Sequence, residues 1–143
     1  MHDSLPVALV TGSTSGIGAA IARRLSRDGY AVVLHSRQSA EAGRALAAEL
    51  GSAVYVQADL AVDADRVRLV REAVAAWGRL DVLVNNAGIS GSVPDRMDLD
   101  YFDKQWEINA RGTFLGMKLA RDLLAKSGRG SIVNMSSVLG LIA

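Results

Sequence analysis

The residues Thr11-Gly12-Ser13-Thr14-Ser15-Gly16-Ile17-Gly18 follow the apolar run 5–10 and precede a stretch of helical periodicity that ends at Gly29. A strand, a glycine-rich turn and a helix in this order form the usual context of a phosphate-binding turn. Gly12 permits a tight turn, while Gly16 and Gly18 let a ligand and the sheet approach the helix backbone. The first N–H groups of the helix then face an anion such as pyrophosphate. We therefore predict a dinucleotide site, rather than an ordinary glycine- and serine-rich loop, at Gly12, Ser13, Thr14, Ser15, Gly16, Ile17 and Gly18.

The composition is that of a compact domain. The chain has 143 residues, half of them hydrophobic, and a formal net charge of +1. This balance indicates neither a nucleic-acid partner nor a membrane surface, and no apolar run reaches the length of a membrane span. No cysteine is present, and His2 and His35 stand alone in the sequence, so neither a disulfide nor a metal site is expected. The start of the chain lacks the pattern of a secretion signal, so we expect a cytoplasmic location.

Strand and helix patterns alternate along the chain. Short apolar runs predict strands, and apolar residues at spacings of three and four predict helices. This alternation is typical of an α/β domain, and right-handed crossovers would give a doubly wound, Rossmann-type parallel sheet of strand order 3-2-1-4-5. The later predicted strands are 31–35, 53–57, 81–85 and 131–135, and the later predicted helices are 40–50, a helix from about Asp63 through Val67, Val70, Val74 and Trp77 to Gly78, and 98–126.

The end of the second predicted strand bears on the choice between NAD and NADP. An acidic residue there would accept hydrogen bonds from the ribose hydroxyls and repel a phosphate. Here the strand ends His35-Ser36-Arg37, with no carboxylate before Glu41. The planar guanidinium of Arg37 suits a 2′-phosphate, and Ser36 adds a hydroxyl, so we predict NADP(H). The alternative is a solvated surface arginine, and His35 is expected to be a partly buried strand-end residue rather than a phosphate ligand.

Further motifs follow the later strands in a fixed order. They are Asp59-Leu60 after the third strand, Asn85-Asn86-Ala87-Gly88 after the fourth, Asn109 in the long helix, and Ser136-Ser137-Val138-Leu139-Gly140 after the fifth. Together with the glycine-rich turn, these motifs make the chain resemble the short-chain dehydrogenase/reductases. Within that family it is most similar to the 3-oxoacyl-(acyl-carrier-protein) reductases of fatty acid biosynthesis.

The resemblance implies cofactor-binding roles after the third and fourth strands. Asp59, followed by Leu60, would accept a hydrogen bond from the adenine amino group. The alternative for Asp59 is to cap the helix that begins near Asp63. Small residues after the fourth strand would let the cofactor ribose lie against the backbone, although Asn85 and Asn86 could also tie loops together. The residues implied here are Asp59, Leu60, Asn86, Ala87 and Gly88.

The resemblance also implies the reaction, which is reduction of a carbonyl to an alcohol by hydride transfer from NADPH. Ser137 would orient and polarise the carbonyl of a small-molecule or acyl-thioester substrate. Asn109 would hold a water molecule of the proton relay, or else bend or locally unwind the long helix. The segment from Ile89 to Met97 would contribute to the rim of the substrate site.

The family's proton donor, a tyrosine in a Tyr-x-x-x-Lys motif beyond the serine, is not found before the last residue, Ala143. We therefore expect residues 1–143 to be the NADP-binding, N-terminal portion of a longer single-domain enzyme, inactive on their own. The alternative is a non-catalytic NADP-binding or sensing module. By resemblance, the complete protein would be a homodimer or homotetramer that uses apolar surface at Phe114, Leu115 and Met117.

Overall fold

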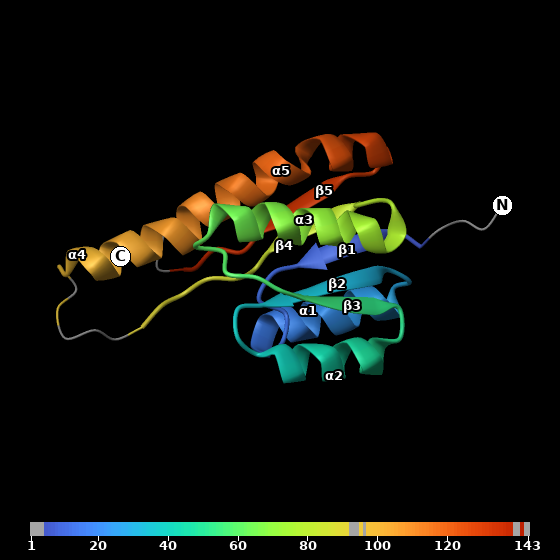
Figure 1. The fold of residues 1–143 in the computed structure, drawn as a ribbon, viewed down its shortest axis with the longest axis horizontal. Helices are drawn as coiled ribbons and strands as arrows, with labels where there is room; N and C mark the ends of the chain where they lie inside the picture. Colours follow the sequence, from blue (N-terminus) through green and yellow to red (C-terminus); the bar gives the residue numbers. More distant parts are fainter. Residues whose placement is uncertain (1–4, 92–94, 96, 139–140, 142–143) are drawn as a thin grey trace.

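The computed structural model describes residues 5–91, 95, 97–138 and 141. Their centre is a five-stranded parallel sheet of order β3-β2-β1-β4-β5, as the sequence predicts (Figure 1). Leu9 of the central strand β1 pairs with Val33 of β2 on one side and with Leu83 of β4 on the other. The strands are β1 (Val7–Val10), β2 (Ala31–Ser36), β3 (Ala53–Gln57), β4 (Val82–Asn85) and β5 (Ser131–Asn134).

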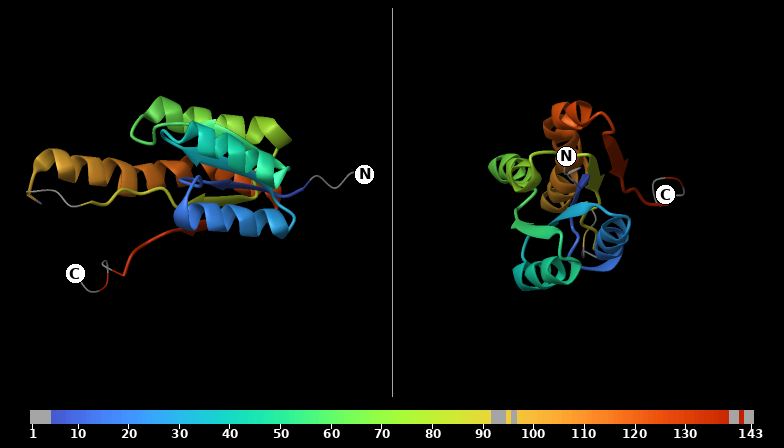
Figure 2. Two further views of the ribbon diagram at one scale, coloured as in Figure 1. Left: turned by 90° about the horizontal axis from the view of Figure 1, so that it is seen from below. Right: turned by 90° about the vertical axis from the view of Figure 1, so that its right-hand side faces the viewer.

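Helices cover both faces of the sheet (Figure 2). The helices α1 (Gly16–Arg27) and α2 (Ala40–Leu50) pack on one face. The other face carries α3 (Asp63–Trp77) and α5 (Gly112–Ser127). The helix α5 ends a long helical stretch that begins with α4 (Leu99–Gln105) and continues through a π-helical segment η1 (Trp106–Arg111). No helix in the described part of the chain is long and apolar enough to span a bilayer.

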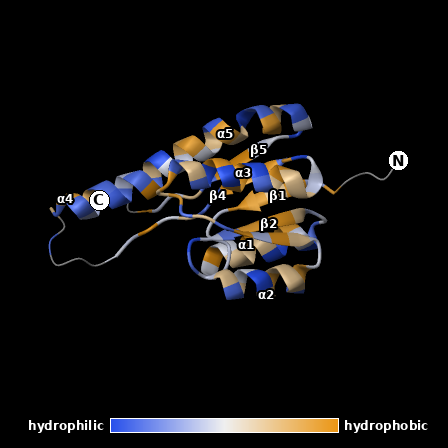
Figure 3. Cartoon of the chain, in the orientation of Figure 1, coloured by the Kyte–Doolittle hydropathy of each residue, from blue (hydrophilic) through white to orange (hydrophobic). Residues whose placement is uncertain are grey.

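Because helices cover both faces of the sheet, every residue of β1 and β2 is buried, and most of these residues are apolar. Figure 3 shows these strands as the hydrophobic centre between helices with polar outer faces. Alternate strand residues enter two separate core clusters. Leu9 and Val33 pack with α3 and α5, whereas Val10 and Val32 pack with α1 and α2. The strand β5 lies at the sheet edge, and its four residues are exposed.

Two details of the predicted helices differ in the structure. In α3 the predicted apolar face included Val67, but that side chain is about half exposed, and Arg66 is buried in its place. The predicted helix 98–126 is not uniform, because η1 separates α4 from α5 just before Gly112. The two differences are linked, because the buried Arg66 of α3 donates to Glu107 of η1.

Candidate functional site

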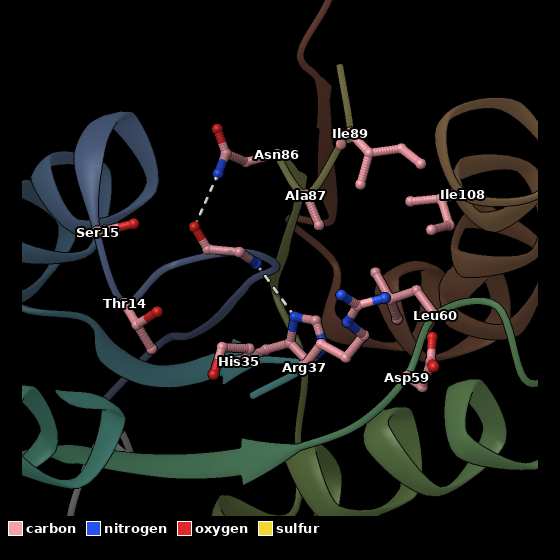
Figure 4. A pocket seen from close by; sticks show the side chains of 13 residues that line it. Thr14, Ser15, His35, Arg37, Asp59, Leu60, Asn86, Ala87, Ile89 and Ile108 are labelled. Carbon is pink, nitrogen blue, oxygen red and sulfur yellow. Dashed lines mark hydrogen bonds between the residues drawn. The ribbon is translucent and has the colours of Figure 1, made fainter. Parts of the chain in front are cut away.

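A pocket of about 300 Å³ lies at the carboxyl ends of β1, β2, β3 and β4, between the glycine-rich turn and η1 (Figure 4). In an open parallel sheet this edge, where neighbouring crossovers diverge, is where ligands bind. The pocket also includes Ile89, from the expected substrate rim, and His35 and Ile108, which were not predicted as ligand-binding residues. The predicted cofactor-binding residues that line it are Gly12, Thr14, Ser15, Ser36, Arg37, Asp59, Leu60, Asn86, Ala87 and Gly88.

The glycine-rich turn needs glycine for two different reasons. Gly12 has φ +62°, and a Cβ on it would lie 2.9 Å from the Cα of Ala87. Gly18 lies where α1 crosses the turn, and a Cβ on it would overlap the carbonyl oxygen of Gly12 and approach Nδ2 of Asn86. Of the predicted residues outside the pocket lining, Ser13 and Gly18 are buried, whereas Gly16 and Ile17 are exposed.

Side-chain hydrogen bonds join the turn to the loop after β4. Nδ2 of Asn86 donates to the carbonyl oxygens of Thr11 and Gly12, at 3.0 and 3.1 Å. The hydroxyl of Thr11 accepts from the N–H groups of Asn86 and Ala87, at 3.0 and 2.9 Å. Asn86 therefore ties loops together while it lines the pocket, so the two interpretations of this residue are compatible.

His35 supports the turn from beneath. Its Nδ1 accepts from the Gly12 N–H at 3.1 Å, and its Nε2 lies 3.0 Å from the carbonyl oxygen of Ala58. The Ser13 hydroxyl accepts from the His35 N–H, and the Ser13 N–H donates to the His35 carbonyl, both at 2.9 Å. The N–H groups of Gly12 and Ser13 therefore already donate hydrogen bonds to His35. An anion at this turn is left with the N–H groups of the first turn of α1.

Ser36 and Arg37 form the pocket wall at the end of β2. The Ser36 hydroxyl is buried and lies 2.8 Å from the hydroxyl of Tyr55. Arg37 is exposed, and Figure 4 shows its guanidinium turned into the pocket on the side of Asp59 and Leu60. A residue with a hydroxyl and a residue with a positive charge therefore line the same pocket, where the sequence predicts a 2′-phosphate.

Asp59 holds the loop between β3 and α3. Its Oδ1 accepts from the Ala61 N–H at 2.9 Å, and its own N–H donates to Oδ2 of Asp65 at 2.7 Å. The residue that precedes α3 is Val62, and no side chain caps the helix there. The capping role considered for Asp59 is therefore not found.

Asn109 lies in η1, so the local unwinding considered as the alternative for this residue is present as a π-helical segment. Its side chain clips the backbone of Ile89. Oδ1 accepts from the Ile89 N–H and Nδ2 donates to the Ile89 carbonyl, both at 2.8 Å. The same Nδ2 donates to Gln105 at 2.7 Å. Asn109 thereby positions one wall of the pocket without lining it.

Arg66, which was not predicted as a site residue, anchors η1 to α3. Its guanidinium donates to Asp63 and, at 2.8 Å, to Oε1 of Glu107, and it lies 3.3 Å from the Glu107 carbonyl. Hydrogen bonds from Arg66 and Arg111 hold the pKa of the Glu107 carboxyl below its usual value. Its position in the sequence could have indicated that Arg66 is buried, because this residue shares a helix face with Leu69, Val70 and Ala73.

The predicted catalytic serine, Ser137, follows β5 in an exposed segment outside the pocket lining. The end of its motif, residues 139–140, lies outside the described residues. The same holds for residues 92–94 and 96 of the expected substrate rim.

Comparisons with known proteins agree with this architecture. The model of a family described as short chain dehydrogenase matches residues 6–143. A Streptomyces violaceoruber protein named as ketoacyl reductase 2 of the granaticin polyketide synthase is 48% identical over 139 residues, which cover 94% of this chain and 56% of that protein. Zerumbone synthase of Zingiber zerumbet is 41% identical, covering 96% of this chain and 53% of that protein.

A 3-oxoacyl-[acyl-carrier-protein] reductase of Synechocystis sp. is 40% identical over 142 residues, which cover 95% of this chain and 57% of that protein. The chain thus spans about half the length of these curated relatives. The family match extends over the sheet, the glycine-rich turn and the loops that form the pocket. The chain belongs to the short-chain dehydrogenase family.

Proposed function

We propose that the pocket binds NADP(H) and that the complete protein reduces a carbonyl to an alcohol by hydride transfer. The observation that carries the proposal is the pairing of Ser36 and Arg37 at the end of β2, in the same pocket as the glycine-rich turn. A 2′-phosphate is a dianion near neutral pH, and a guanidinium beside a hydroxyl provides donors for it. Family membership supports a nicotinamide cofactor in this pocket.

The pocket residues divide among the parts of the cofactor. Thr14 and Ser15, beside the first N–H groups of α1, would hold the pyrophosphate. Asp59 and Leu60 would contact the adenine, and Asn86, Ala87 and Gly88 would lie against a ribose. The fit rests on the close approach of backbones at Gly12, where any side chain would meet Ala87.

For the reaction itself, NADPH supplies the hydride. Ser137 would donate a hydrogen bond from its hydroxyl to the substrate carbonyl oxygen and so stabilise the negative charge that develops there. Asn109 would keep the Ile89 wall in place through its two backbone hydrogen bonds. A 3-oxoacyl thioester or a related ketone is the proposed substrate class, which the names of two relatives support.

The assembly and location are also proposals. Phe114 is 62% exposed on α5, and Leu115 and Met117 are partly exposed beside it. An apolar helix face of this kind fits a homodimer or homotetramer of the complete protein. We propose that this assembly is cytoplasmic.

Replacing Arg37 by Ala tests the cofactor choice. We expect the affinity for NADPH to fall about tenfold, because a charge-assisted hydrogen bond to the 2′-phosphate is lost, while the affinity for NADH changes less than about twofold. Titration calorimetry with both cofactors measures this difference. Arg44→Ala, which removes an exposed arginine from α2, is the matched control. Equal losses for NADPH and NADH would contradict the assignment.

The function is tested by mixing the full-length protein with NADPH and a 3-oxoacyl thioester and following the absorbance of the reduced nicotinamide. Oxidation of NADPH that depends on the thioester supports the proposed reductase. Binding of NADPH without oxidation by this thioester, other ketones or sugars would favour the non-catalytic module. Failure to bind NADPH would refute both.

A further inference from the structure

The imidazole of His35 joins two backbone segments, the glycine-rich turn and the segment after β3. Nδ1 faces the Gly12 N–H at 3.1 Å, and Nε2 faces the Ala58 carbonyl oxygen at 3.0 Å. Both contacts are hydrogen bonds only when Nε2 carries a proton and Nδ1 carries none. The side chain is 2% exposed, so water has little access to replace either partner. The contacts therefore specify the neutral Nε2–H form of His35.

One partner, Gly12, lines the pocket, and the residue that follows the other partner, Ala58, lines it as well. Gly12 is the residue at which the chain turns out of β1, with φ +62°. Ala58 directly precedes Asp59, which holds the loop on the other side. Figure 4 shows the His35 ring beneath the pocket with its bond to the turn. The ring thus fixes the separation between the turn and the Asp59 loop.

We propose that neutral His35 is a positioning residue of the cofactor site, and that cofactor affinity depends on its protonation state. The proposal rests on the proposed cofactor site. A proton on Nδ1 would set two N–H donors face to face, and the Gly12 turn would have to move. That movement displaces the first turn of α1, where the pyrophosphate would bind.

The surroundings of His35 set the direction of its titration. Burial lowers its pKa from the usual 6.5, and the bond to Ala58 and the carboxylates of Asp59 and Asp65 offset this only in part. Arg37, which directly follows β2, has a positive charge that disfavours a second cation nearby. The glycine-rich turn has no ionisable side chain. The neutral form therefore prevails at neutral pH and is lost in acid.

The test compares two ligands and three forms of the full-length protein between about pH 5 and pH 8. ADP-ribose has the pyrophosphate but lacks the 2′-phosphate, which itself titrates near pH 6 in NADPH. We expect wild-type affinity for both ligands to fall toward the acid end, approaching about tenfold only at a pH below the pKa of His35 in the complex. In His35→Asn, Oδ1 still accepts from Gly12 but does not titrate, so ADP-ribose affinity stays nearly constant. The matched control His2→Asn keeps the wild-type dependence.

A measurement on the wild-type protein makes the test independent of how well the variant folds. If the neutral form binds ADP-ribose better, then by linkage the ligand lowers the pKa of His35, by about one pH unit for a tenfold effect. An NMR titration of the imidazole with and without ADP-ribose detects this change. A raised or unaltered pKa would overturn the positioning role, as would equal acid dependence in His35→Asn. Failure of the wild-type protein to bind either ligand at about pH 8 refutes the cofactor site itself.

Discussion

Replacing Asp81 by Ala is expected to lower the free energy of unfolding by about 3 kcal/mol. Asp81 is 1% exposed and directly precedes β4, and its carboxylate joins three segments. It accepts from the Val7 N–H at 2.8 Å and takes a two-point contact from Arg79 at 2.8 and 2.6 Å. Arg129 approaches it at 3.5 Å from the turn before β5. Removing the carboxylate leaves a β1 N–H and a partly buried guanidinium without this acceptor.

Chemical denaturation followed by circular dichroism measures this loss, which corresponds to about 10 °C in melting temperature for a chain of this size. Asp122→Ala is the matched control. Asp122 also pairs with an arginine, Arg121, at 2.9 Å, but both side chains are largely exposed, so the expected loss stays below about 0.5 kcal/mol. Equal losses in the two variants would show that burial of Asp81 contributes nothing.

The pH dependence gives a second check on Asp81. Burial acts to raise its pKa, but the hydrogen bonds from Arg79 and Val7 and the charges of Arg79 and Arg129 together outweigh burial and hold the pKa below the usual 3.8. A carboxyl with a lowered pKa stabilises the fold above its unfolded-state pKa, and this contribution is lost as the pH falls through the folded-state pKa. The difference in stability between wild type and Asp81→Ala is therefore full at neutral pH and shrinks in acid.

The sheet could be predicted from the sequence because its strands are short apolar runs bounded by turns. Both faces of the sheet are covered, so β1 and β2 need almost no polar residues, and the runs stand out clearly. Alternation with helices then fixed the crossovers, and the order 3-2-1-4-5 followed from their right-handedness. Helix faces are less determined by sequence. Val67 and Arg66 are adjacent and both are compatible with burial of Val70, and only packing against η1 selects Arg66.

The site was predictable where backbone shape requires a particular residue. Gly12 and the small residues after β4 meet at a close contact, and this requirement shows in the sequence as glycine and alanine. The contacts of His35 and Asn109 could not be predicted, because they join residues 23 and 20 positions apart through backbone atoms. The residue types at Gly12 and Ile89 do not reveal that a distant side chain binds the backbone atoms of these residues.

Substituting Gly18 by Ala is expected to weaken NADPH binding at least about a hundredfold, which corresponds to about 2.7 kcal/mol. The new Cβ would overlap the Gly12 carbonyl oxygen and lie 2.6 Å from Nδ2 of Asn86. The carbonyl belongs to the turn itself, so the overlap is relieved only by moving α1 away from the turn. That movement carries the first N–H groups of the helix away from the proposed pyrophosphate position and breaks the Asn86 bond to Gly12.

Gly29→Ala separates this effect from a general loss of stability. Gly29 has φ +88°, and a Cβ there meets no atom within 4 Å, so the substitution strains the backbone without touching the pocket. We expect it to cost about 1 kcal/mol in the free energy of unfolding and to leave NADPH affinity within about twofold of wild type. Titration calorimetry on folded protein compares the two variants. Wild-type affinity in Gly18→Ala would mean that the cofactor does not depend on the α1 turn, and the pyrophosphate position would have to lie elsewhere in the pocket.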